Sequence, residues 1–272
     1  LGKGYFTQPS LYKNRIVFVC EDDLWEVGSE GGQARRLTNS RSEIRTPFLD
    51  PSGQWIACCA KEEGDPDVYL MSSEGGPLTR LTWLNSVTHI VGWTPEGRSI
   101  LFRSIHQAVH HRGSDAWLFR VDVKGGPVQR LPFGPAVSLD YQKEGPGIVL
   151  GRNSNNNSRW KRYRGGMVGE VWVDEKGKGD FQRILQNVDG NPVSPRWKEN
   201  RIWFVSDHED IGNLYSCDTK GKDLRTESSQ QEYYVRDPAF NDQQVVYHCG
   251  GDIWSLDTFA TQKKEKRTIS KS

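Results

Sequence analysis

The amino-acid sequence predicts an all-β fold, a six-bladed β-propeller with four antiparallel strands in each blade. The first observation behind this prediction is a phrase that occurs six times, an apolar residue followed by an aromatic residue. The pairs are Leu24-Trp25, Val68-Tyr69, Leu118-Phe119, Val171-Trp172, Leu214-Tyr215 and Ile253-Trp254. Their aromatic residues lie 39 to 53 residues apart in sequence, which is the spacing typical of propeller blades.

The second observation is the chemistry of the turns. A glycine turn follows the aromatic residue in the first five units, at Gly31-Gly32, Gly75-Gly76, Gly125-Gly126, Gly177-Lys178-Gly179 and Gly221-Lys222. Glycine adopts the positive φ that a tight hairpin requires, so each of these turns joins a C strand to a D strand. The preceding A–B turns use proline and glycine, as in Pro51-Ser52-Gly53 and Pro95-Glu96-Gly97.

The strands follow from the residues between these turns. In the first unit we predict A at residues 5–7, B at 15–19, C at 24–27 and D at 34–38. The predicted B strands are apolar almost throughout, for example Ile202-Trp203-Phe204-Val205, because a central blade strand is buried on both faces. The predicted D strands carry charge, as in Arg36-Leu37-Thr38, and a charged outer edge resists pairing with other sheets.

The repeat predicts one domain over residues 1–272, with approximate blades at 4–39, 43–83, 88–132, 136–186, 192–226 and 233–270. The first unit has its own A strand at Tyr5-Phe6-Thr7, and the last ends on its own D strand at Lys266-Arg267-Thr268-Ile269. We therefore expect an open closure, a ring in which the first and last blades are not interlocked and meet by packing alone.

Composition limits the functional classes. The formal net charge of +1 argues against nucleic acid or an anionic membrane as a partner, and no apolar run is long enough to span a bilayer. The five cysteines are odd in number and lack a C-x-x-C pair, which disfavours a disulfide framework and a zinc site and favours buried thiols in a reducing compartment. The first residue is Leu1, so we expect the sequence to be a piece of a longer polypeptide.

One B–C loop is the strongest candidate for binding. This basic loop, Gly151–Gly166, holds five basic residues, the aromatic residues Trp160 and Tyr163, and no acid. The candidate substrate-binding or peptide-binding residues are Arg152, Arg159, Lys161, Arg162 and Arg164. Such a loop suits a carboxylate, a phosphate or an acidic peptide, and the alternative is a solvated surface loop whose aromatic residues pack on the blade.

Other loops carry weaker signals. His106, His110 and His111 follow the third B strand, but no carboxylate or cysteine completes a metal-binding spacing, so we expect no metal and no cofactor. The acidic segments Glu21-Asp22-Asp23, Glu62-Glu63-Gly64-Asp65 and Asp207-His208-Glu209-Asp210 lack the ordered spacing of a calcium loop and are typical of turns. The chain also has no G-x-S-x-G, H-E-x-x-H or phosphate-loop motif, so we expect no catalytic residue in it.

Across nearly its whole length the chain resembles the N-terminal six-bladed propeller of the tricorn protease family. The most specific matches are the opening strand pair, Asn14–Cys20 with Asp22–Glu26, and the motif Gly151-Arg152-Asn153 with Trp160-Lys161-x-Tyr163-Arg164-Gly165-Gly166. Further matches are Gly221–Arg225 and Tyr233-Tyr234.

The resemblance implies a cytoplasmic serine peptidase that assembles as a homo-hexamer and degrades oligopeptides. The catalytic residues would lie in the remaining domains of the same polypeptide, outside this chain. The propeller would act as a channel or gate for peptides beside the catalytic chamber, with a ring that is not interlocked.

The sequence departs from the family pattern at one point. The family has a longer segment with an arginine pair between blades two and three, associated with binding the C-terminal carboxylate of a peptide, whereas this chain has only Trp83–His89 without arginine. We hypothesise that Arg159, Arg162 and Arg164 supply a substitute positive surface. Two other classes remain open at this point: a TolB-like propeller that binds protein partners, and the propeller cap of a prolyl-oligopeptidase-type hydrolase.

Overall fold

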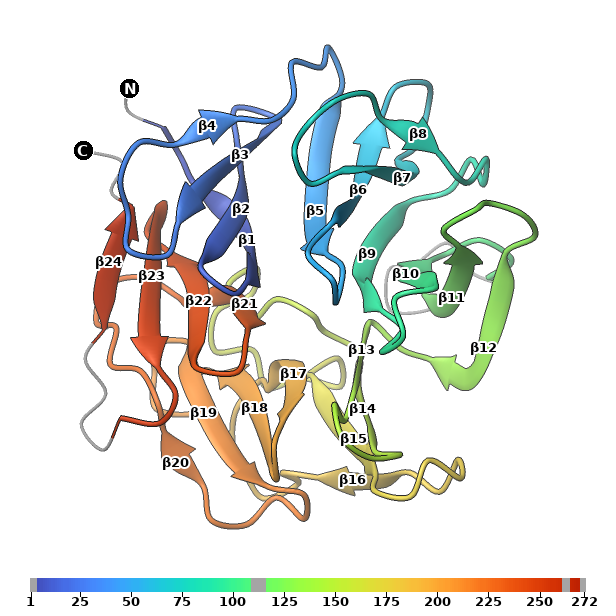
Figure 1. The fold of residues 1–272 in the computed structure, drawn as a ribbon. Helices are drawn as coiled ribbons and strands as arrows, with labels where there is room; N and C mark the ends of the chain where they lie inside the picture. The colour runs from blue at the N-terminus through green and yellow to red at the C-terminus, as the bar shows by residue number, and fades with distance from the viewer. Residues whose placement is uncertain (1–3, 109–115, 261–264, 270–272) are drawn as a thin grey trace. The chain divides into compact units, whose positions relative to one another are not determined.

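A computed structural model describes residues 4–108, 116–260 and 265–269, and it contains six four-stranded sheets, each formed by four strands consecutive in sequence (Figure 1). The strands of the first three sheets are β1 (Thr7–Tyr12), β2 (Arg15–Cys20), β3 (Asp23–Gly28), β4 (Arg35–Arg36), β5 (Glu43–Leu49), β6 (Trp55–Lys61), β7 (Asp67–Ser72), β8 (Thr79–Arg80), β9 (Thr88–Trp93), β10 (Ser99–Ser104), β11 (Trp117–Asp122) and β12 (Gln129–Pro135). The other three sheets contain β13 (Ser138–Tyr141), β14 (Ile148–Arg152), β15 (Glu170–Asp174), β16 (Gln182–Ile184), β17 (Val193–Lys198), β18 (Arg201–Ser206), β19 (Asn213–Asp218), β20 (Arg225–Thr226), β21 (Arg236–Phe240), β22 (Gln244–Cys249), β23 (Asp252–Asp257) and β24 (Lys266–Ile269).

This arrangement confirms the predicted fold class, an all-β six-bladed β-propeller with antiparallel blades. The described ranges contain no helix, and therefore none that has the length and apolar character to cross a bilayer. The glycine pairs lie in the left-handed region as predicted, with φ of 88° at Gly31 and 114° at Gly32. All five cysteines are free and buried.

Residue contacts divide the chain into two compact units, one of residues 1–106, 119–129 and 237–272 and the other of residues 107–118 and 130–236. In the first unit the leading strands β1, β5 and β9 lie side by side (Figure 1), and a core of residues such as Val17, Ile56 and Tyr69 packs between sheets. In the second unit β13 packs against β17 around Val149 and Phe204. The B strands are buried on both faces, as their apolar sequences predict.

A buried hydrogen-bonded brace recurs where a C strand begins. In the second sheet, Thr82 Oγ1 donates to Asp67 Oδ1 (2.7 Å) and accepts from the Val68 backbone N–H (3.0 Å), while the Leu84 N–H also donates to Asp67 Oδ1 (3.0 Å). The same contacts join Asp23 to Thr38 in the first sheet and Asn213 to Ser228 in the fifth. In these three sheets the brace ties the outer D strand to its own C strand.

The brace also explains a difference from the predicted D strands. The first D strand was expected over residues 34–38, but only Arg35–Arg36 pair with β3. Beyond them the Leu37 N–H donates to the Leu24 carbonyl and the Thr38 hydroxyl turns inward to Asp23, so side-chain contacts replace the regular ladder.

The leading strands of the first unit carry bulges at polar residues. Gln8 and Thr46 adopt φ of 52° and 48°, and the strand register shifts at each of them. These side chains reach the next sheet: the Thr46 N–H donates to Gln8 Oε1 (2.6 Å) and the Ile90 N–H donates to Thr46 Oγ1 (3.2 Å). In the other direction the Gln8 N–H donates to Nδ1 of His248 (3.3 Å), so side chains link four neighbouring sheets.

The first and sixth sheets meet without exchanging a strand, which confirms the open closure. The expectation of packing alone was incomplete, because the Phe6 N–H donates to the Gly251 carbonyl (3.0 Å) and Asn241 Nδ2 donates to the Lys13 carbonyl (2.6 Å). Phe6 was also expected in the first A strand, but β1 begins at Thr7 and the Phe6 backbone bonds to the sixth sheet instead.

Replacing the brace hydroxyl should destabilise the protein. Thr82→Val leaves the Val68 N–H without its acceptor and removes one donor from buried Asp67, so we expect the free energy of unfolding to fall by about 1–3 kcal/mol. The matched control is Thr79→Val on β8, three residues earlier, where the side chain is exposed and the change should stay within about 0.5 kcal/mol. Chemical denaturation measures both, and equal losses would contradict the brace.

The open closure should be visible in amide exchange. We expect the amides of β2 and β22, beside the junction of the first and sixth sheets, to exchange faster than those of β6, because no shared strand spans that junction. Hydrogen–deuterium exchange followed by peptide mass spectrometry measures this difference, and equal protection of all three strands would count against it.

Candidate functional site

The basic loop leaves the fourth sheet where β14 ends at Arg152, and the chain returns to the sheet at Glu170. Asn153 adopts a φ of 65°, and its Nδ2 donates to the Val168 carbonyl (3.0 Å), which closes the base of the loop. Asn157 is buried, and its Nδ2 donates to the Asn191 carbonyl (3.4 Å). The loop is therefore attached to its own sheet and to the segment that precedes β17.

Arg152 lies under the loop. Its guanidinium donates to the carbonyls of Phe133 (2.8 Å) and Pro135 (3.0 Å) and stacks over the Trp172 ring at 5.2 Å. Its Nε is buried without a hydrogen-bond partner, and burial lowers the pKa of the side chain. These contacts hold the guanidinium between backbone carbonyls of the third sheet and the Trp172 ring of the fourth.

A buried carboxylate organises the rest of the loop. Asp207 is 0 % exposed and accepts from three donors: Arg164 Nη1 (3.1 Å), the Asn191 N–H (2.9 Å) and the Arg162 N–H (2.8 Å). Arg164 Nη2 also donates to the Asp207 carbonyl (3.1 Å). A buried carboxylate requires such partners, because the free energy of removing its charge from water is otherwise uncompensated.

The predicted basic residues therefore divide into groups. Arg164 is one-third exposed and bonded to Asp207, with Nε 3.1 Å from Oδ1 of Asp189. Arg162 forms an exposed ion pair with Asp210, Nη1 to Oδ1 at 2.8 Å, and its backbone adopts a φ of 56° to deliver its N–H to Asp207. Both residues are thus partly or wholly neutralised by acids of the loop between β18 and β19.

Two cations remain available to a ligand. Arg159 is exposed and forms no ion pair or hydrogen bond with any residue in the described ranges. Lys161 is also exposed, with Nζ over the Tyr234 ring at 5.5 Å and no acid beside it among those residues. Between them Trp160 is 61 % exposed, and its ring lies 5.4 Å from that of Tyr163. The loop thus presents two free positive charges around an exposed indole.

A small hollow of about 150 Å³ lies beneath the loop, lined by Arg164, Glu170, Arg183 and Asp189 among others. Its charges are paired with one another, since Arg183 Nη1 lies 3.2 Å from Glu170 Oε1 and Arg164 contacts Asp189. Glu170 also accepts from the Trp172 indole N–H (2.9 Å). The hollow is polar, but its charged side chains are paired with one another and are not available to bind a ligand.

Sequence reasoning assigned Asp207 and Asp210 only to a turn and missed their role as counter-ions of the basic loop. A usable signal was present, because a loop with five cations and no acid requires carboxylates from another segment if its arginines are to be held. Asn191 had no such signal, since it acts through its backbone N–H and through Oδ1, which accepts from the Gly169 N–H (2.7 Å).

The other acidic segments have structural partners. Asp23 belongs to a brace, Asp22 pairs with Arg45 (3.1 Å), and Glu62 accepts from the Tyr69 hydroxyl (3.1 Å). Within residues 4–108, 116–260 and 265–269, no group of three or more histidine, cysteine or acidic side chains could hold a metal ion. His110 and His111 of the histidine segment lie outside the described residues.

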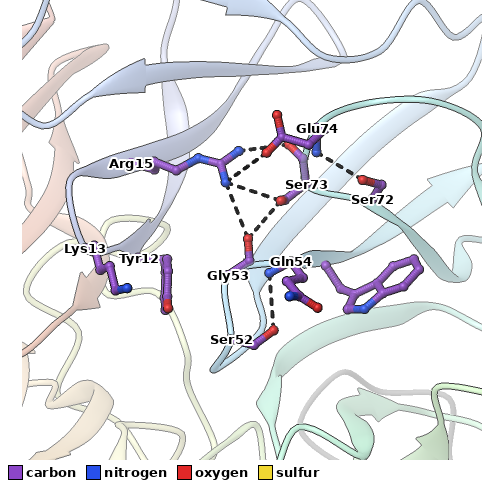
Figure 2. A pocket seen from close by; sticks show the side chains of 10 residues that line it. Tyr12, Lys13, Arg15, Ser52, Gly53, Gln54, Ser72, Ser73 and Glu74 are labelled. Carbon is purple, nitrogen blue, oxygen red and sulfur yellow. Dashed lines mark hydrogen bonds and ion pairs between the residues drawn. The ribbon is translucent and has the colours of Figure 1, made fainter.

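A larger cavity of about 490 Å³ lies in the first unit between the turns of the first and second sheets (Figure 2). Its wall includes Tyr12, whose ring lies so close to Gly53 that a Cβ there would fall 2.2 Å from it. Arg15 donates to Glu26 of its own sheet (2.8 Å) and to the Ser73 carbonyl of the second sheet (3.0 Å). The positive charge of Arg15 is therefore already paired with carboxylates of the protein.

The buried anchor of the basic loop should dominate its stability. Asp207→Asn leaves the Arg164 guanidinium without its buried counter-charge, and we expect the free energy of unfolding to fall by about 3 kcal/mol or more. The matched control is Asp210→Asn, which breaks only the exposed pair with Arg162 and should cost less than about 1 kcal/mol. Urea denaturation compares the two variants, and equal effects would contradict the anchor.

Comparison with known proteins places the chain. The family model described as the tricorn protease N-terminal beta propeller domain matches residues 3–262. Tricorn protease homolog 1 of Streptomyces coelicolor is 36% identical over 260 residues, which cover 93% of this chain and 24% of that protein. A relative from Sulfurisphaera tokodaii, named as the N-terminal subunit of a tricorn-like protease, is 25% identical over 176 residues, covering 63% of this chain and 87% of the relative.

The solved structures agree. The crystal structure of the tricorn protease superposes with a TM-score of 0.86 and 26% identity, covering 98% of this chain and 26% of that one. The chain thus spans about a quarter of the length of the full tricorn proteases that it matches. The match of the family model to almost the whole chain carries the assignment: the chain belongs to the tricorn protease N-terminal β-propeller family.

Proposed function

We propose that this chain is the non-catalytic propeller domain of a tricorn-like serine peptidase that degrades oligopeptides. In this proposal the two units form one domain. That domain acts as a channel or gate for peptides beside the catalytic chamber. Two findings support it: membership in the tricorn family, and coverage of only about a quarter of the full-length relatives, which leaves room for catalytic domains elsewhere in such a protein.

The basic loop is the proposed contact with peptides. Arg159 and Lys161 supply the free positive charges, Trp160 supplies an apolar surface, and Arg162 contributes where a ligand competes with Asp210. Arg152 and Arg164 position the loop through Phe133 and Asp207. A peptide carboxylate is the favoured ligand, since guanidinium and ammonium groups bind it by charge-assisted hydrogen bonds.

The observation that carries this proposal is the contrast within one loop. Asp207 holds the backbone at Arg162 and the side chain of Arg164, while Arg159 and Lys161 project without acidic partners in the described structure. A loop fixed before it meets a ligand loses less conformational entropy on binding, so this arrangement suits recognition better than an unanchored solvated loop does.

The partners and setting follow from the family. The remaining domains would belong to the same polypeptide or to a separate chain, as the named N-terminal subunit of Sulfurisphaera tokodaii suggests for that protein. A homo-hexamer and a cytoplasmic location are part of the proposal. The buried free thiols agree with a reducing compartment, because burial raises the pKa of Cys59 to about 12 and keeps it unreactive.

Charge reversal in the full-length protein tests the loop. In the double variant Arg159→Glu, Lys161→Glu, we expect the KM for an oligopeptide with a free C-terminal carboxylate to rise about tenfold, with kcat unchanged, because the loop binds peptide away from the chemistry. The matched control is Lys176→Glu, Lys178→Glu, the same change of charge in the exposed turn between β15 and β16. An unchanged KM in the first double variant would sink the proposal.

A further inference from the structure

The cavity between the turns of the first and second sheets offers aromatic surface to a ligand. Tyr12, at the end of β1, is half-buried and forms one side of the cavity (Figure 2). Trp55, at the start of β6, also lines it and is 45% exposed. The volume of about 490 Å³ lies within the range of roughly 300–1,000 Å³ that is typical of ligand pockets. The cavity is therefore large enough to hold a ligand against two aromatic side chains.

Contacts within the protein hold the wall of this cavity in place. Gly53 has a φ of 74° and leaves space for the Tyr12 ring, which a Cβ at this position would strike. The Gly53 carbonyl accepts from the hydroxyl of Ser73 (2.8 Å), a residue that is 2% exposed. Arg15 of the first sheet then fixes Ser73 through its carbonyl (3.0 Å). A wall that is ordered before binding lowers the entropy cost of holding a ligand.

The polar groups that remain available in the cavity are mainly donors. The Tyr12 hydroxyl, the Lys13 ammonium and the Trp55 indole N–H have no hydrogen-bond acceptor among the residues that the structure describes. Lys13 Nζ lies over the Tyr12 ring at 5.2 Å. The Gln54 side chain, on the other side of the cavity in Figure 2, is also unpartnered within those ranges and supplies an amide with two N–H donors and one acceptor.

The acceptors that line the cavity are, in contrast, already engaged. The Ser52 hydroxyl donates to Asp50 Oδ2 (2.5 Å), and Ser72 Oγ accepts from the Glu74 N–H (3.2 Å). The Glu74 carboxylate pairs with Arg15, with Oε1 3.3 Å from Nη1. A ligand that fits this cavity therefore brings acceptors and apolar surface and few donors of its own.

A proline-rich segment has this chemistry. Each proline residue carries a carbonyl acceptor and an apolar ring but no N–H. In the polyproline II conformation the carbonyls form no internal hydrogen bonds, and aromatic-lined grooves recognise this conformation in other proteins. A saccharide fits less well, because each of its hydroxyls is also a donor and requires a free acceptor, whereas Glu74 and Ser72 are engaged.

We propose that this cavity binds a proline-rich segment of an oligopeptide in the polyproline II conformation. The Tyr12 and Trp55 rings pack against the proline rings, and the donors of Tyr12, Lys13, Gln54 and Trp55 bind the carbonyls. The inference goes beyond the proposed function, because the cavity shares no residue with the basic loop and requires neither a peptide carboxylate nor a catalytic domain.

The test uses the full-length protein and octaproline that carries a neutral dye and a C-terminal amide, so the peptide has no carboxylate. Two control peptides carry the same dye and amide. One is octaproline made of D-proline, whose helix has the opposite hand, and the other is a glycine–serine peptide of the same length. Fluorescence anisotropy measures each Kd, and we expect saturable binding of L-octaproline alone.

Two variants assign the binding to the cavity. Trp55→Leu removes the indole and should raise the Kd for L-octaproline about tenfold. Tyr12→Phe keeps the ring, removes only the hydroxyl donor and should raise the Kd about threefold. The matched control is Trp83→Leu, the same substitution at another exposed tryptophan of the first unit that does not line the cavity, and its Kd should not change. Urea denaturation checks that all three variants are folded.

The proposal is overturned if L-octaproline does not bind saturably, if the D-peptide binds equally well, or if either cavity variant leaves the Kd unchanged. Displacement of L-octaproline by maltoheptaose, a neutral oligosaccharide, would also overturn it and assign the cavity to sugars. The double variant Arg159→Glu, Lys161→Glu should bind L-octaproline normally, so failure of this inference and failure of the basic-loop proposal are separate results.

Discussion

A buried oxygen acceptor must collect donors from the chain around it, and much of this structure depends on that requirement. Asp67 takes the Thr82 hydroxyl, the Leu84 N–H and the Arg80 guanidinium, and Asn213 takes the corresponding hydroxyl and N–H in the fifth sheet. The two-residue outer strands have too few ladder bonds to hold by themselves. The acceptor at the start of the C strand fixes where each one ends.

The same requirement shapes the candidate site. Asp207 differs from the brace acceptors in collecting donors from the basic loop and from the segment before β17, rather than from its own sheet. Its position after a buried B strand removes it from water, and the loop supplies the compensating charge. The residues of one loop thus differ: Arg164 is held at Asp207, while Arg159 has no acidic partner within the described ranges.

Patterns of short range were predictable from the sequence, and contacts between distant segments were not. A glycine pair marks a turn that needs positive φ, and an apolar run marks a strand that is buried on both faces. Both signals lie within a few residues, so the positions of these turns and strands were predicted correctly. The pairing of Arg164 with Asp207 joins residues 43 apart, and the contact of Phe6 with Gly251 joins the two ends of the chain. Neither contact produces a repeating pattern in the sequence from which it could be predicted. Arg152 is a further example. An arginine in a basic loop suggests a contact with a ligand, but the fold places this one against two backbone carbonyls.

The brace has a consequence for how such a chain can change over generations. Its hydroxyl lies 15 residues after its carboxylate or amide in the first, second and fifth sheets, within the same hairpin. Both partners of the brace belong to the same sheet. A gene segment that encodes such a sheet can therefore be duplicated or exchanged without leaving a buried polar group in a neighbouring sheet without its hydrogen-bond partner. The links through Gln8 and Thr46 are the opposite, since each belongs to two sheets at once. A substitution in a brace should therefore disturb one sheet, whereas a substitution at Gln8 or Thr46 should disturb two.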